Sequence, residues 1–131
     1  MTINAKVGFK QMVAEAEKEI DFLSVENAME LVGAEDVVFV DIRDVRELER
    51  EGRIPGAYHM PRGMLEFWID PESPYHKDVF DEDKRFVFYC AAAWRSALAT
   101  ATAKRMGLEK TFHIDGGLSA WKQAGGPIET Y

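Results

Sequence analysis

Short apolar runs alternate along this chain with helix-forming stretches, and this alternation limits the folds that the chain can adopt. The runs cover residues 20–23, 37–40, 57–60, 86–89 and 111–114. Residues 37–40 and 86–89 are continuous in β-branched and aromatic side chains, which is typical of strands buried on both faces. The pattern predicts an α/β fold in which a parallel sheet is covered by helices on both faces.

Helices are expected between these runs. The segments concerned are residues 9–18, 25–32, 44–51, 62–68, 96–106 and 118–124. Ser24 has the character of an N-cap for the second segment, while Gly33 and Gly107 end the second and the fifth. No repeat, low-complexity tract or linker interrupts the 131 residues, so no domain boundary is expected within this order of elements.

Charge and composition exclude several classes of function. The formal net charge of −7 disfavours a nucleic-acid partner, because neutralising phosphates requires a basic face. No run approaches the roughly 18 apolar residues of a membrane span, and the first residues lack the pattern of a secretory signal. A single cysteine permits no internal disulfide, so we expect a cytoplasmic, reducing location.

Three polar or reactive residues directly follow predicted strands. They are Asp41, Cys90 and Asp115. Ligands of parallel sheets bind beyond the carboxyl ends of the strands, so these residues mark the expected position of a site.

The segment that follows Cys90 has the composition expected of a loop that surrounds a nucleophilic cysteine. Three alanines come next, and Arg95-Ser96 opens a predicted helix. Backbone N–H groups of such a loop and of the first helical turn converge on the cysteine and favour its reactive thiolate form. On this segment alone, a buried core cysteine followed by an ordinary helix remains an alternative interpretation.

Three ordered motifs carry a wider resemblance. They are residues 40–43 with Glu47 and 52–57, then 90–95, then 115–121 with 125–127. Together they resemble the rhodanese family. The resemblance implies a five-stranded parallel sheet flanked by helices, with residues 20–131 as the rhodanese-like domain and residues 1–19 as an N-terminal helical extension.

The same resemblance implies sulfur transfer through a persulfide on Cys90. A donor such as thiosulfate or a persulfide would supply the sulfur, and cyanide or a cellular thiol would accept it, with neither metal nor organic cofactor. The residues implied to bind substrate around the sulfur are Ala91, Ala92, Ala93, Trp94, Arg95 and Ser96. Asp41 and Glu47 are expected to support the loop, and Arg95 either pairs with one of them or contacts the donor.

Other functions stay open beside this one. The fold can serve as a non-enzymatic docking module, or as a persulfide carrier whose acceptor is another protein. Related cysteine phosphatases and arsenate reductases have one residue more between cysteine and arginine than the four that separate Cys90 from Arg95, and usually a histidine where this chain has Tyr89. The shorter loop favours a sulfur atom over a tetrahedral oxyanion.

Some positions depart from the family pattern. Arg53 replaces a frequent histidine, and Ala93 and Trp94 stand where glycine is common. Because alanine disfavours positive φ, we expect the loop to avoid left-handed residues. Trp94 either lines the pocket beside Cys90 or packs on the core. Asp115 is expected to cap the last turn and the helix that follows it. The histidines at 59, 76 and 113 are expected to be packing or surface residues.

Overall fold

The five apolar runs form one parallel sheet in the computed structural model, which describes residues 2–131 and leaves Met1 of the predicted extension outside the described residues. The strand order is β1-β5-β4-β2-β3. The strands are β1 (Asp21–Leu23), β2 (Val37–Asp41), β3 (Tyr58–His59), β4 (Arg85–Tyr89) and β5 (Thr111–Ile114). Every pair is parallel, so the prediction of a parallel, five-stranded α/β fold is confirmed.

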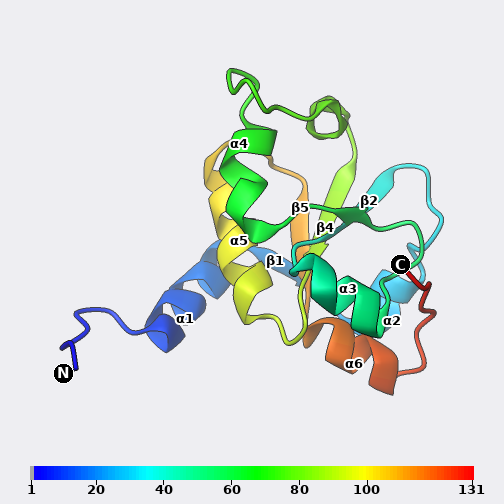
Figure 1. The fold of residues 1–131 in the computed structure, drawn as a ribbon, viewed down its shortest axis with the longest axis horizontal. Coiled ribbons are helices and arrows are strands. Elements are labelled where there is room, and N and C mark those ends of the chain that lie inside the picture. The colour runs from blue at the N-terminus through cyan, green and yellow to red at the C-terminus, as the bar shows by residue number, and fades with distance from the viewer. Residues whose placement is uncertain (1) are drawn as a thin grey trace.

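Helices cover both faces of this sheet (Figure 1). They are α1 (Phe9–Glu19), α2 (Val25–Met29), α3 (Val45–Glu51), α4 (Leu65–Ile69), α5 (Trp94–Arg105) and α6 (Gly117–Gln123), with 3₁₀ turns at Arg62–Met64 and Asp78–Asp81. In Figure 1, α4 and α5 lie on one side of the strands and α2, α3 and α6 on the other. Within residues 2–131, no helix combines the length and the apolar character that crossing a bilayer requires.

Side chains of β4 alternate between two cores. Phe86 and Phe88 belong to the cluster under α4 and α5, whereas Val87 and Tyr89 belong to the cluster under α2 and α6. This is the period of two that a strand buried on both faces must have. Cys90 continues the alternation into the first cluster, so its side chain points toward the α5 face.

Three predicted helices differ in extent from the structure. The second ends at Met29, because the next amides bond three residues back, as Leu31 N does to the Ala28 oxygen, and tight turns then lead to Gly33. Residues 62–68 divide into a 3₁₀ turn and α4. Helix α5 begins at Trp94, two residues earlier than predicted, so its first turn belongs to the cysteine loop.

Helix α1 lies against α5 at the edge of the sheet (Figure 1). Val13, Ala16 and Ile20 pack onto Ala97 and Ala101, whose small side chains let the two helices approach closely. Ile20, expected to begin the first strand, instead ends α1 and is buried in this contact. The division between an extension of residues 1–19 and a domain of residues 20–131 stays a prediction.

A buried ion pair joins the end of β2 to the end of α3. The side chains of Asp41 and Arg43 are both fully buried, with Nη2 of Arg43 2.7 Å from Oδ2 of Asp41 and Nε 2.9 Å from Oδ1. Nη2 also donates to the Gly52 carbonyl at 2.7 Å. Two charges this deep are tolerated because each satisfies the other and the remaining donors find acceptors.

Replacing Arg43 with methionine should therefore destabilise the fold, because it leaves the Asp41 carboxylate buried without its counter-charge. We expect Arg43→Met to lower the free energy of unfolding by about 3–5 kcal/mol in chemical denaturation. Arg46→Met is the matched control, since Arg46 pairs with Asp44 on the surface and should change stability by less than about 1 kcal/mol. Equal effects of the two substitutions would contradict this account.

Candidate active site

The residues that follow the strands lie close together beyond the carboxyl ends of the strands. Asp41 ends β2, Cys90 comes directly after β4, and Asp115 comes directly after β5. Since β4 lies between β5 and β2, Cys90 stands between the other two residues. These polar residues thus gather at the carboxyl ends of the strands, where the sequence analysis expected a site.

Two backbone amides donate to the sulfur of Cys90, and the Ser96 hydroxyl oxygen lies within reach of its thiol hydrogen. The residue is 1% exposed. The amides of Ala93 and Ser96 donate to Sγ at 3.2 and 3.4 Å, and the Ser96 hydroxyl lies 3.6 Å away. Such donors favour the thiolate, which is the nucleophilic form of cysteine.

The predicted donors do not act alike. Only Ala93 and Ser96, of the six residues from 91 to 96, direct an amide at the sulfur in the part of the chain that the structure describes. Ala91 instead uses its carbonyl, which accepts from Ser119, and Trp94 begins α5. Ala92 is exposed on the outside of the loop.

Ala93 is left-handed, with φ 97° and ψ −13°, so the expectation that the loop avoids positive φ is wrong. It is also the one non-glycine residue with positive φ among those described. The short loop must reverse between the end of β4 and the start of α5 while it aims two amides at one atom, and this conformation does so. An L-residue pays about 1–2 kcal/mol there, which the surrounding contacts must offset.

Those contacts come from α6. The amides of Leu118 and Ser119 donate to the carbonyls of Cys90 and Ala91 at 2.9 and 3.0 Å. Helices leave their first amides without internal partners, and here the cysteine loop supplies the acceptors. Gly117 permits this approach, because a Cβ at that position would lie 2.7 Å from both carbonyl oxygens.

Arg95 points its guanidinium at α3. Its Nη1 and Nη2 donate to the two carboxylate oxygens of Glu47 at 2.9 and 3.0 Å. The hydrogen bonds from Arg95 hold the pKa of the Glu47 carboxyl below its usual value. Asp41 has a different partner, Arg43, so of the two predicted supports Glu47 alone pairs with Arg95.

Trp94 stands outside the core. It is 56% exposed, and its ring packs on the ring of Phe9, which is also exposed, with 4.8 Å between the ring centroids. Of the two interpretations of Trp94, packing on the core does not describe this position. The first residues of α1 thereby reach the loop that carries the cysteine.

His113 is the residue that sequence reasoning missed. Its Nδ1 lies 3.1 Å from Oγ of Ser96, so a chain of polar groups runs from Cys90 through Ser96 to the histidine. Burial lowers the pKa of the His113 imidazole. A polar residue on the buried face of a predicted strand was the available signal, but the partner lies 17 positions away in sequence.

The other two histidines lie elsewhere. His59 bonds to the Arg43 carbonyl at 2.8 Å. His76 pairs with Asp81 at 2.9 Å and, with Asp78, forms the one group in residues 2–131 with ligand atoms close enough for a metal ion. Both acids are exposed, in the 3₁₀ turn that precedes β4, and Cys90 follows the other end of that strand.

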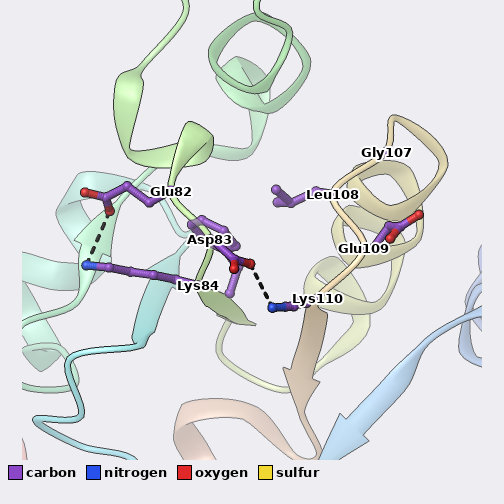
Figure 2. A pocket seen from close by; sticks show the side chains of 8 residues that line it. Glu82, Asp83, Lys84, Gly107, Leu108, Glu109 and Lys110 are labelled. Atoms are coloured by element: carbon purple, nitrogen blue, oxygen red, sulfur yellow. Dashed lines mark hydrogen bonds and ion pairs between the residues drawn. The ribbon is translucent and has the colours of Figure 1, made fainter.

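A cavity lies at the opposite, amino-terminal ends of the strands. This cavity of about 200 Å³ is lined by residues that precede β4 and β5, as Figure 2 shows. Four of its charged residues form two pairs, Lys110 with Asp83 at 2.7 Å and Lys84 with Glu82 at 3.4 Å. It holds no nucleophile and lies at the amino ends of the strands, so it is not the site.

The sequence of this chain matches a known family. The sequence model of the rhodanese-like domain matches residues 24–124. The chain belongs to the rhodanese family. This confirms the resemblance on which the sequence interpretation depended, and α1 lies outside the matched residues.

Individual proteins extend the comparison. The chain is 30% identical to the putative sulfurtransferase YtwF of Bacillus subtilis, over 80% of this chain and 90% of that one. A solved structure from Rhodopseudomonas palustris is 56% identical, with a TM-score of 0.95 over 98% of this chain and 99% of that one, and is described as a possible tyrosine phosphatase of unknown function. The polysulfide-sulfur transferase homodimer of Wolinella succinogenes is 30% identical, with a TM-score of 0.69 over 92% of this chain and 86% of that one.

Some relatives are longer than this chain. The match spans 46% of the length of one curated relative and 61% of another. Whole-protein activities of such relatives therefore do not transfer directly to this rhodanese-family chain.

The left-handed alanine gives a stability prediction. Ala93→Gly removes the steric penalty at positive φ but adds freedom to the unfolded chain, so we expect a gain of up to about 1 kcal/mol in the free energy of unfolding. Ala92→Gly, one residue earlier and without positive φ, should lose about 0.5–1 kcal/mol. Thermal and chemical denaturation measure both, and a loss at residue 93 as large as that at residue 92 would contradict the strain.

Proposed function

We propose that this rhodanese-family protein is a sulfurtransferase that carries a sulfane sulfur as a persulfide on Cys90. The observation that supports this most directly is the sulfur atom itself, which accepts hydrogen bonds from the Ala93 and Ser96 amides at 3.2 and 3.4 Å. Such a cradle accommodates a single anionic sulfur and favours a nucleophilic thiolate.

In the first step the Cys90 thiolate attacks the outer sulfur of a donor such as thiosulfate. The new sulfur–sulfur bond forms as the donor's own bond breaks, and sulfite leaves with the electron pair of that bond. The amides of Ala93 and Ser96 stabilise the negative charge of the persulfide. Glu47 holds Arg95 beside the loop, and Asp41 acts through Arg43.

In the second step an acceptor takes the sulfur. A thiolate or cyanide attacks the outer sulfur of the persulfide, and the Cys90 thiolate leaves with the bonding electrons. The enzyme alternates between two covalent forms, so ping-pong kinetics are expected. Neither step draws on a metal or an organic cofactor, and a cytoplasmic, reducing environment provides thiol acceptors.

Two other functions remain distinguishable by experiment. A persulfide carrier would load sulfur but pass it only to a protein acceptor. Phosphatase activity deserves a direct test because the Rhodopseudomonas palustris relative is described as a possible tyrosine phosphatase. The four-residue spacing from Cys90 to Arg95 argues for the smaller sulfur substrate.

Sulfur loading gives the decisive test. Intact mass after thiosulfate treatment should show one added sulfur in the wild type and none in Cys90→Ser, since the chain has no other cysteine. Thiocyanate formation from thiosulfate and cyanide should likewise require Cys90.

The remaining outcomes identify the alternatives. Loading without turnover on any small acceptor would favour the carrier. Cys90-dependent hydrolysis of an aryl phosphate that vanadate inhibits would favour the phosphatase. Absence of both loading and turnover in the wild type would overturn the sulfurtransferase.

The exposed Trp94 predicts a preference among acceptors. Trp94→Ala removes an aromatic surface beside the loop, so we expect KM for an aromatic thiol to rise about two- to tenfold while KM for cyanide stays unchanged. Phe9→Ala should have a similar, smaller effect because the two rings pack together.

Phe67→Ala provides the control, since Phe67 is an equally exposed aromatic residue on α4. A parallel rise in KM for cyanide in Trp94→Ala would mean that the tryptophan shapes the loop and not the acceptor site.

A further inference from the structure

The sulfur of Cys90 has a polar route that leads away from the loop. The residue is 1% exposed, so little solvent reaches it directly. On the side of Ser96, the hydroxyl lies 3.6 Å from Sγ and 3.1 Å from Nδ1 of His113. These three groups come from the end of β4, the first turn of α5 and the middle of β5.

The sheet register places His113 for this contact. His113 is paired with Phe88 of β4, so it stands on the same face as that residue and beneath the start of α5. The residue is 4% exposed. Its neighbour in β1 is Phe22, which carries no ionisable group.

A cavity lies on the other side of the histidine. It has a volume of about 220 Å³ and is lined by Glu17, Ile20, Phe22, His113 and Asp115. Nδ1 is occupied by Ser96, which leaves Nε2, across the ring, for this cavity. The imidazole therefore contacts Ser96 and also lines a hollow beside α1, β1 and β5.

The charged groups around His113 are few. Glu17 faces it from α1 and Asp115 from the end of β5, while α5 presents only Ser96 to it. Burial outweighs these two carboxylates and lowers the pKa of the imidazole. A neutral ring at pH 7 has one nitrogen free to accept a proton.

We propose that Ser96 and His113 form a proton relay that takes the thiol proton of Cys90 to the cavity between α1, β1 and β5. The Sγ–H bond breaks as the Ser96 oxygen takes the proton. The Ser96 hydroxyl proton passes to Nδ1 of His113, and the Nε2 proton leaves to water or a carboxylate in the cavity. His113 is a positioning residue, since it acts on the sulfur through Ser96.

The proposal depends on the proposed function only because sulfur transfer uses the thiolate that the relay produces. A purely structural role is the competing account. The Ser96 hydroxyl also lies 3.2 Å from the Ala93 carbonyl, and its single hydrogen could serve the loop instead of the histidine.

Alkylation of Cys90 by iodoacetamide across a range of pH separates the two accounts. The chain has no other cysteine, so the rate reports this thiolate alone. We expect His113→Asn and Ser96→Ala to react about tenfold more slowly than wild type at pH 7, because the thiol then attacks without a neighbouring base to take its proton, and we expect the rates to converge at high pH, where hydroxide removes the proton directly. Asparagine can still bond to Ser96 but does not titrate, so a structural role predicts a wild-type profile for it.

Two further variants sharpen this test. The double variant His113→Asn/Ser96→Ala should match the single variants, because both substitutions interrupt one chain. Thr111→Val is the control, since Thr111 is buried on the same face of β5 and has no bond to Ser96. A wild-type profile in His113→Asn, or additive losses in the double variant, would overturn the relay.

A second measurement covers the case in which a variant fails to fold. The imidazole titration of His113, followed by NMR, should shift between wild type and Cys90→Ser, and an unchanged titration would overturn the relay. Neither measurement uses a sulfur donor. Absence of sulfur loading with an intact alkylation profile would therefore reject the proposed function and leave the relay standing.

Discussion

The hydrogen bonds from α6 to the carbonyls of Cys90 and Ala91 decide how the whole site is oriented. With these two carbonyls held by Leu118 and Ser119, the loop can turn its own amides toward the sulfur. The closeness of the two segments requires Gly117, because any side chain there would meet both carbonyl oxygens. The glycine pair that follows β5 thus helps to shape the cysteine loop at the end of β4.

The carboxylates near the sulfur are each neutralised by an arginine. Asp41 is bound to Arg43 in the core, and Glu47 is bound to Arg95 at the surface of the loop. Without these pairs, two negative charges at the same edge of the sheet would oppose a thiolate. Arg43 therefore balances the charge of Asp41 in the core, and Arg95 balances the charge of Glu47 while it joins the cysteine loop to α3.

Sequence reasoning found the sheet and placed Cys90 at the carboxyl ends of its strands, but it did not give the details of the loop. The strands were predictable because residues 37–40 and 86–89 are continuously apolar, and the site followed because Cys90 comes directly after one of them. The left-handed conformation of Ala93 was not predictable, because contacts with α6, far along the chain, outweigh the preference of alanine for negative φ. His113 was missed for a similar reason: only the pairing of β5 with β4 brings it beside Ser96.

Helix α1 lies outside the residues that match the family, yet Phe9 touches the tryptophan that adjoins the cysteine loop. The groups that hold the sulfur and the surface beside them therefore come from separate stretches of the chain. Substitutions at exposed positions such as Phe9 can alter that surface without removing the loop amides, the arginine pairs or the contact between α1 and α5. The surface beside the cysteine can in this way change through a segment that supplies none of the hydrogen bonds to the sulfur.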